Sequence, residues 1–178
     1  MYVWIGCRLP AAFEHELRYG LREMSREFGL SEVAFTLPQH ISLKMSFPVE
    51  KERVEAVLKA VSDILAKEKP FAVRLDGVEQ VEGVLWLKIR SNSRLKTMHT
   101  QLDAMLQKDF GVEPHRFDHD FRFHSTLFLD KDVEKLRRVY EILSQYPNDE
   151  TLGIAQFLIG TSETGEAGTY RVVREILV

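Results

Sequence analysis

The sequence predicts a single domain of mixed helices and strands that is built as two related halves. Its 178 residues are about one domain by the usual rough prior of 150 residues. Strand-like and helix-like segments alternate along the whole chain, with no low-complexity tract or linker to mark a boundary. Each half contains a helix, a strand with a histidine and a second helix, in that order. This repeated order indicates an internal repeat of architecture.

The first half begins with a strand and continues as helix, strand and helix. Residues 2–9 are rich in β-branched and aromatic side chains, which favours a strand. Pro10 suits the first turn of a helix, and Gly29 stands where that helix would end. Residues 40–47 alternate as a second strand, and a second helix follows that Pro70 closes. The apolar positions that predict the two helices are Phe13, Leu17, Leu21, Met24 and Phe28, then Val54, Val57, Leu58, Val61, Ile64 and Leu65.

The second half repeats this alternation. Residues 71–75 and 84–89 are two strands that a Gly-containing loop can join as an antiparallel pair. A strand is expected at 121–129, and two closing strands are expected near 154–159 and 170–178. Two amphipathic helices precede and follow the strand at 121–129. Their apolar positions are Leu95, Met98, Leu102 and Met105, then Val133, Leu136, Val139, Tyr140 and Leu143.

The composition excludes several classes of protein. With 44% hydrophobic and 29% charged residues, the chain is typical of a soluble globular protein. No apolar run approaches the roughly 20 residues of a membrane span, and no basic leader precedes the first strand. A single cysteine, Cys7, cannot form an intramolecular disulfide, so we expect a cytoplasmic protein, with Cys7 as a small buried side chain. We also expect a monomer. The net charge of −3 argues against a binder of long nucleic acid and leaves room for a site for one nucleotide or RNA end.

Two of the predicted strands carry polar side chains on one face. In the strand at 40–47, alternation places His40, Ser42 and Lys44 together, opposite an apolar face. In the strand at 121–129, the same rule places Arg122, His124 and Thr126 together. The two strands occupy corresponding places in the two halves.

These side chains suit acid–base chemistry at phosphorus. An imidazole titrates near neutrality, so one histidine can accept a proton while the other donates one. The hydroxyls of Ser42 and Thr126 could donate to phosphate oxygens, and Lys44 and Arg122 could neutralise the charge that develops there. Neither motif contains a carboxylate, so we expect no metal and no cofactor.

The segments His40-Ile41-Ser42-Leu43 and His124-Ser125-Thr126-Leu127 resemble the paired motifs of the two-histidine (2H) phosphoesterase superfamily, the LigT-like or 2′-5′ RNA ligase and cyclic phosphodiesterase family. The resemblance covers nearly the whole chain. It implies an α+β, bilobed fold in which residues 1–178 form one domain of two interleaved lobes, each with an antiparallel sheet and flanking helices, around a central cleft. It also implies that His40 and His124 are catalytic, and that Ser42 and Thr126 bind phosphate. Serine stands at 42, where threonine is frequent in the family.

Other side chains offer competing interpretations. His115 and His119 have the spacing of a helical metal pair, but Pro114 disfavours a helix, so we expect a solvated loop there. His15 and His99 are expected at the surface or in packing. Three aromatic residues could stack on a base but are more typical of a core: Trp4, Trp86 and Tyr170.

We therefore expect a metal-independent phosphoesterase acting on a 2′,3′-cyclic phosphate or a 2′-5′ linkage of a nucleotide or RNA end. The alternative is a non-catalytic module that binds a nucleotide or RNA end at the same place. Binding needs cations and hydroxyls but not two groups that transfer protons, so the histidine pair favours an enzyme. The sequence leaves open which histidine is the acid and which is the base.

Overall fold

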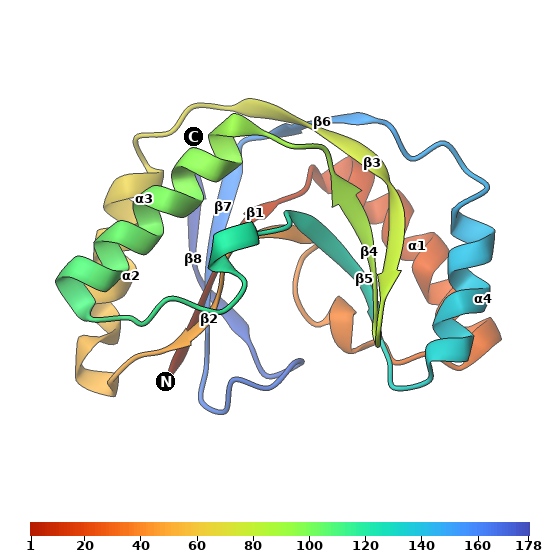
Figure 1. Cartoon of the computed structure of the whole chain (residues 1–178), viewed down its shortest axis with the longest axis horizontal. Coiled ribbons are helices and arrows are strands. Elements are labelled where there is room, and N and C mark those ends of the chain that lie inside the picture. The colour runs from red at the N-terminus through yellow and green to blue at the C-terminus, as the bar shows by residue number, and fades with distance from the viewer.

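A computed structural model, which describes residues 1–178, contains two four-stranded antiparallel sheets and four α-helices (Figure 1). The first sheet has the strand order β2-β1-β7-β8, and the second has the order β5-β4-β3-β6. The strands are β1 (Tyr2–Arg8), β2 (His40–Pro48), β3 (Phe71–Val81), β4 (Val84–Ile89), β5 (His124–Leu129), β6 (Thr151–Ile154), β7 (Gln156–Ser162) and β8 (Arg171–Leu177). The helices are α1 (Ala11–Phe28), α2 (Val54–Leu65), α3 (Ser93–Phe110) and α4 (Val133–Leu143). The predicted α+β architecture of two related lobes is therefore confirmed.

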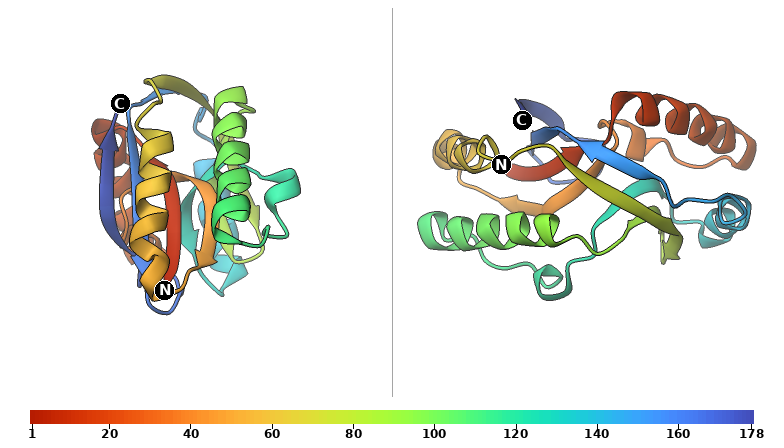
Figure 2. Two further views of the ribbon diagram at one scale, coloured as in Figure 1. Left: turned by 90° about the vertical axis from the view of Figure 1, so that its left-hand side faces the viewer. Right: turned by 90° about the horizontal axis from the view of Figure 1, so that it is seen from above.

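The helices are exchanged between the two lobes. α2 and α3 lie together beside the first sheet, with α3 against β2, whereas α1 and α4 lie together beside the second sheet (Figures 1 and 2). The helix that precedes each histidine-bearing strand is thus packed in the opposite lobe. One continuous cluster of 33 buried apolar residues extends through both lobes, so neither lobe has a separate core.

The two histidine-bearing strands meet where the lobes join. β2 and β5 are edge strands of their own sheets, and they lie side by side (Figure 1). We call this junction of β2 and β5 the lobe interface. It places the two sequence motifs next to each other although they are far apart in the chain.

Three predicted strands have different bounds. β3 continues beyond Leu75 through an irregularity in its pairing with β4, and a tight turn at Glu82 and Gly83 joins the two strands. The strand expected at 154–159 is divided at Ala155, so that β6 belongs to the second sheet and β7 to the first. β5 begins only at His124, which is the first of its residues to pair with β4 and lies opposite Lys88.

The helix bounds agree closely with the apolar pattern. Gly29 ends α1 with a φ of 63°, a left-handed conformation that glycine adopts without strain. None of the four helices combines the length and the apolar character needed to cross a membrane.

Candidate active site

His40 is packed by a tryptophan from the neighbouring strand of the first sheet. The ring centroids of Trp4 and His40 are 4.2 Å apart in an edge-on arrangement, and the Trp4 Nε1–H donates to Ser42 Oγ at 3.1 Å. Glycines make the space for this indole, because a Cβ on Gly6 or Gly160 would lie 2.6 Å or 2.9 Å from it. Trp4 thus orients both polar side chains of the first motif.

His124 has an equivalent partner in the second sheet. Trp86 of β4 stacks on His124 with ring centroids 4.1 Å apart, and it lies directly opposite Thr126 in the strand pairing. Its Nε1–H donates to Glu79 Oε2 at 3.2 Å. Trp4 is buried, as expected of a core residue, and both Trp4 and Trp86 also pack against a candidate catalytic histidine.

Both imidazoles are held in the same way. The Nδ1 atom of His40 lies 2.7 Å from the Pro38 carbonyl oxygen, and the Nδ1 atom of His124 lies 2.7 Å from the Arg122 carbonyl oxygen. A carbonyl oxygen can only accept, so each Nδ1 carries the proton. Nε2 of each ring has no partner in the protein and is left to accept or donate a proton.

The surroundings lower the pKa of both histidines. Burial, and then the charge of His124, lowers the pKa of His40 to about 4, although the Pro38 carbonyl and Glu14 oppose the shift. Burial also lowers the pKa of His124, against the opposing effects of the Arg122 carbonyl and Glu79. Both rings are therefore neutral at pH 7. The mutual influence of the two histidines reflects their closeness across the lobe interface.

A glutamine connects the two motif strands directly. Gln39 immediately precedes His40 and is only 1% exposed. Its side-chain Nε2 donates to the carbonyl oxygen of Thr126 at 3.2 Å. The structure thus brings together four of the residues that the sequence selected, His40, Ser42, His124 and Thr126.

Lys44 does not belong to this group. The pairing of β1 with β2 shifts by one residue, so that Gly6 lies opposite Ser42 but Ile5 lies opposite Lys44. This bulge at Leu43 turns Lys44 away from the face of Ser42 and towards α3. Lys44 is 2% exposed there. The expectation that Lys44 shares the face of His40 is wrong, and we give it no part in phosphate binding.

The Lys44 ammonium is paired with two carboxylates. It lies 2.7 Å from Asp103 Oδ1 and also contacts Asp118 Oδ2. His99, which is buried as well, contacts the carbonyl oxygen of Leu43 through Nδ1 at 2.7 Å. These contacts fix the bulge in β2 from the helix side.

The loop before β5 is largely exposed and contains no α-helix, as expected, with one exception. The side chain of Asp118 is buried against Lys44, and it also accepts the backbone N–H of His115. The one group of three or more metal-ligating side chains that come close together is His99, Asp103 and Asp118, and it includes neither His115 nor His119. Because the Lys44 ammonium contacts both of those carboxylates, it would repel a metal cation there.

Arg122 lies at the edge of the site. Its side chain is exposed, and Nη1 is 3.5 Å from Glu79 Oε1, the same carboxylate group that accepts from Trp86. The carbonyl of Arg122 holds His124, as described above. The role of its guanidinium in binding phosphate stays a prediction.

Two antiparallel sheets that meet at strands carrying one histidine each define a protein of the two-histidine class. The family model of the 2′-5′ RNA ligase superfamily matches residues 13–159, and the chain therefore belongs to that superfamily. BH1439 of Halalkalibacterium halodurans, a protein named for an inferred phosphoesterase activity, is 32% identical over 69 residues. That match spans 37% of this chain and 40% of the relative, so it covers less than half of the relative's length.

Solved structures share the whole fold. TT0787 of Thermus thermophilus has a TM-score of 0.68 and 19% identity, with 99% of this chain and 97% of that chain covered. Escherichia coli LigT complexed with 3′-AMP has a TM-score of 0.65 and 18% identity, with the same coverage. At these identities the likeness establishes the fold alone.

Proposed function

We propose that the protein is a metal-independent phosphoesterase that acts on 2′,3′-cyclic phosphates or 2′-5′ linkages of nucleotides or RNA ends. One observation carries the proposal. His40 and His124 occupy equivalent positions on adjoining strands, and each has Nδ1 bonded to a backbone carbonyl and Nε2 free. Fixed tautomers with free Nε2 atoms are what an acid–base pair requires. The nucleotide seen in LigT supports a small nucleotide as the substrate class.

The pKa shifts suggest how the two histidines divide the work. His40, whose pKa is lowered to about 4, is neutral over a wide pH range and suits the base. His124, beside the Glu79 carboxylate that opposes its shift, suits the acid. His40 Nε2 takes a proton from water as the water oxygen bonds to phosphorus. His124 acts in the doubly protonated form, which the Glu79 carboxylate favours, and it gives its Nε2 proton to the ribose oxygen as the bond between that oxygen and phosphorus breaks. The product is a phosphomonoester.

The remaining side chains would bind the phosphate. Ser42 and Thr126 lie two residues beyond their histidines, and their hydroxyls would donate to the non-bridging oxygens. Ser42 Oγ already accepts from Trp4, so its own proton is free to point towards the substrate. Arg122, exposed at the edge of the site, is the candidate cation. In this proposal the chain's own side chains stabilise the charge.

The test is to offer the purified protein the four 2′,3′-cyclic nucleotides, a 2′-5′-linked dinucleotide and a cyclic-ended oligonucleotide, each with and without EDTA. Products are identified by chromatography and ³¹P NMR. We expect a phosphomonoester to form at a rate that EDTA does not change. His15→Ala is a matched control, because His15 is an exposed histidine of α1 outside the site. Binding of these compounds without turnover would support the binding module instead, and restoration of activity by a metal after chelation would contradict the metal-free mechanism.

A further inference from the structure

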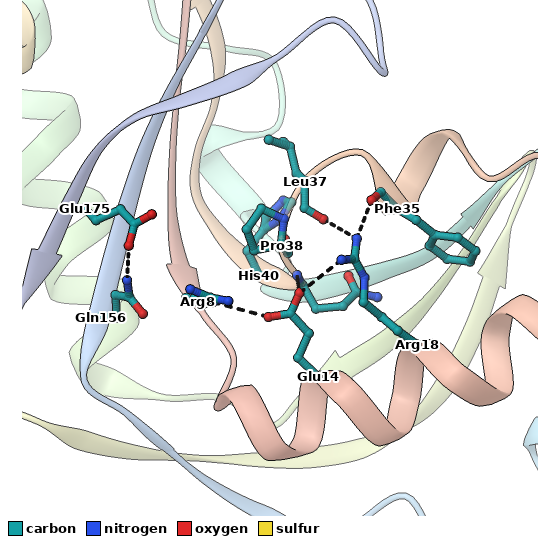
Figure 3. Close-up of polar contacts among 10 residues, drawn as sticks. Arg8, Glu14, Arg18, Phe35, Leu37, Pro38, His40, Gln156 and Glu175 are labelled. Carbon is teal, nitrogen blue, oxygen red and sulfur yellow. Dashed lines mark hydrogen bonds and ion pairs between the residues drawn. The ribbon is translucent and has the colours of Figure 1, made fainter.

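A buried carboxylate lies behind the first motif strand. Glu14, in the first turn of α1, is 6% exposed and is paired with two arginines (Figure 3). Its Oε2 is 3.2 Å from Arg8 Nε, and its Oε1 is 3.4 Å from Arg18 Nη1. We call Arg8, Glu14 and Arg18 the Glu14 cluster. A carboxylate is rarely buried unless it is paired and hydrogen-bonded, as this one is.

The Glu14 cluster binds the backbone of the segment that leads into His40. Glu14 Oε1 accepts the N–H of Gln39 at 3.0 Å. Arg18 Nη2 donates to the carbonyl oxygen of Leu37 at 2.6 Å and also to that of Phe35 (Figure 3). The Pro38 carbonyl between these contacts is the one that holds His40 Nδ1. Glu14 therefore holds the N–H of the same peptide group whose carbonyl orients the imidazole, and Arg18 holds the carbonyl of the peptide group before it.

Gln39 extends this support across the lobe interface. Its carbonyl accepts the N–H of Leu9 at 2.9 Å, and its side chain donates to the Thr126 carbonyl at 3.2 Å. Three elements therefore meet at one buried residue: the end of β1, the start of α1 and β5. The backbone N–H, the backbone carbonyl and the side-chain Nε2 of Gln39 are therefore all bonded, which holds the residue in place.

Because the helices are exchanged between the lobes, the hydrogen bonds of Glu14 and Gln39 connect one lobe to the other. α1 lies with α4 beside the second sheet, whereas β2 belongs to the first. Glu14 thus reaches from a helix of one lobe to the backbone of the motif strand of the other. The side chain of Gln39 then links the start of that strand to the second motif strand, β5, through its hydrogen bond to Thr126.

We propose that Glu14 and Gln39 are positioning residues that hold His40 at a fixed place relative to the second motif, Thr126 and His124. The inference rests on the proposed function, since it assigns these residues a part in its acid–base step. Neither side chain touches the reacting atoms. Productive geometry must be held to about 0.5 Å, and a displacement of 1 Å can cost about 10²-fold in rate. Losing either contact should therefore lower the rate of the chemical step more than substrate binding.

The experiment compares Glu14→Gln and Gln39→Met with Glu23→Gln. The first two variants keep the side-chain volume nearly unchanged and remove, respectively, the charge of the Glu14 cluster and the bond to Thr126. Glu23 is the matched control, because it lies on the same helix and pairs with Arg26 at the surface. We expect kcat to fall about ten- to a hundredfold in the first two with KM within about twofold, and no such change in Glu23→Gln.

A second measurement follows the imidazole of His40 by NMR titration and does not depend on turnover. The charged groups that act on His40 are Glu14 and Arg18 of α1 and His124 of β5, with Arg8 of β1 paired to Glu14. Removing the carboxylate charge in Glu14→Gln should lower the pKa of His40 further, and Gln39→Met should weaken the bias towards the Nδ1–H tautomer. Glu23→Gln should do neither.

The two readouts separate the inference from the proposed function. If the wild-type protein turns over none of the phosphate substrates, the proposed function fails, and the His40 titration still tests the positioning role. Folded Glu14→Gln and Gln39→Met variants with wild-type kcat, or with an unchanged His40 titration and tautomer, would overturn the inference. If one variant does not fold, the other decides by the same criteria. A rise in KM alone would also overturn it, because the residues would then act on binding.

Discussion

Replacing Lys44 by methionine should destabilise the protein strongly. Lys44 is almost fully buried between Asp118, which is also buried, and Asp103, which is partly exposed. Methionine fills a similar volume but leaves the Asp118 carboxylate buried without its counter-ion. Removing one partner of a buried ion pair costs about 3–5 kcal/mol, because the other charge is left uncompensated. For a chain of this size, that loss corresponds to a fall of roughly 6–20 °C in Tm.

The assay is urea unfolding followed by circular dichroism, with Tm as a second readout. Lys59→Met is the matched control, because Lys59 forms an exposed pair with Asp63 on α2. Exposed pairs of this kind contribute about 0–1 kcal/mol. The double variant Lys44→Met with Asp118→Asn should recover part of the lost stability, since the stranded charge is then gone.

Two results would refute this reasoning. One is a Lys44→Met variant no less stable than Lys59→Met, which would mean that the ion pair is not buried as described. The other is a Lys44→Met variant of normal stability that has lost affinity for phosphate substrates. That outcome would mean that Lys44 lies on the same face of β2 as His40, as strict alternation predicts.

Four further predictions follow from the site. Ser42→Ala and Thr126→Ala should each lower kcat/KM by a factor that corresponds to about 1.5–3 kcal/mol of transition-state stabilisation, the usual scale of one hydrogen bond to a charged group. A loss as large as that of the histidine variants would contradict a role limited to phosphate binding. The value of kcat/KM should be greatest between about pH 4 and 6.5. His40 must be neutral, which sets the lower limit, and His124, whose pKa is also lowered, must keep its proton, which sets the upper limit. A maximum above pH 7 would contradict the assignment. The free energy of unfolding should fall as the pH drops from 6.5 towards 4, because the unfolded chain then takes up a proton that folded His40 does not, and a pH titration of urea midpoints that is unaffected by His40→Ala would contradict this. Burial raises the pKa of the Cys7 thiol, so an aromatic disulfide reagent should leave the native protein unmodified and react with one thiol after unfolding; rapid reaction of the native protein would contradict the burial.

The pattern of the sequence predicted the face of each motif strand as far as the alternation continued. His40 and Ser42, like His124 and Thr126, share a face because their strands are regular over those residues. Lys44 lies beyond a bulge, and a bulge inserts one residue without any signal in an apolar and polar pattern. Strict alternation therefore assigned it to the wrong face.

The tryptophans show a signal that was available in the sequence. Leu85, Leu87 and Ile89 are buried on the core face of β4, so the same alternation places Trp86 on the other face, beside His124. Trp4 could be assigned in the same way from the apolar residues around it. In both strands the period of two is a better guide to the position of the tryptophan than the general preference of aromatic residues for a core.

The connections between the lobes depend on long-range packing and could not be predicted from local patterns. Nothing in the helix at 11–28 indicates that it packs in the lobe opposite to the strand that follows it. Nor does the apolar run at 154–159 indicate that the chain changes sheets at Ala155. Glu14 and Gln39 acquire their contacts only through this exchange, and for that reason neither was selected from the sequence.

The most direct test of acid–base catalysis by His40 and His124 is kcat/KM measured against pH for the wild type, His40→Ala, His124→Ala and the double variant. The side chains are truncated without removing a core residue, so circular dichroism should show that all four proteins are folded, and His15→Ala should behave as the wild type. We predict a bell-shaped profile whose limbs belong to the coupled pair, and a fall of about 10²–10⁴-fold in each single variant. The double variant should lose less than the product of the two losses, because both groups act in one step. A flat wild-type profile, or a folded His124→Ala variant with an undiminished rate, would contradict two-histidine catalysis.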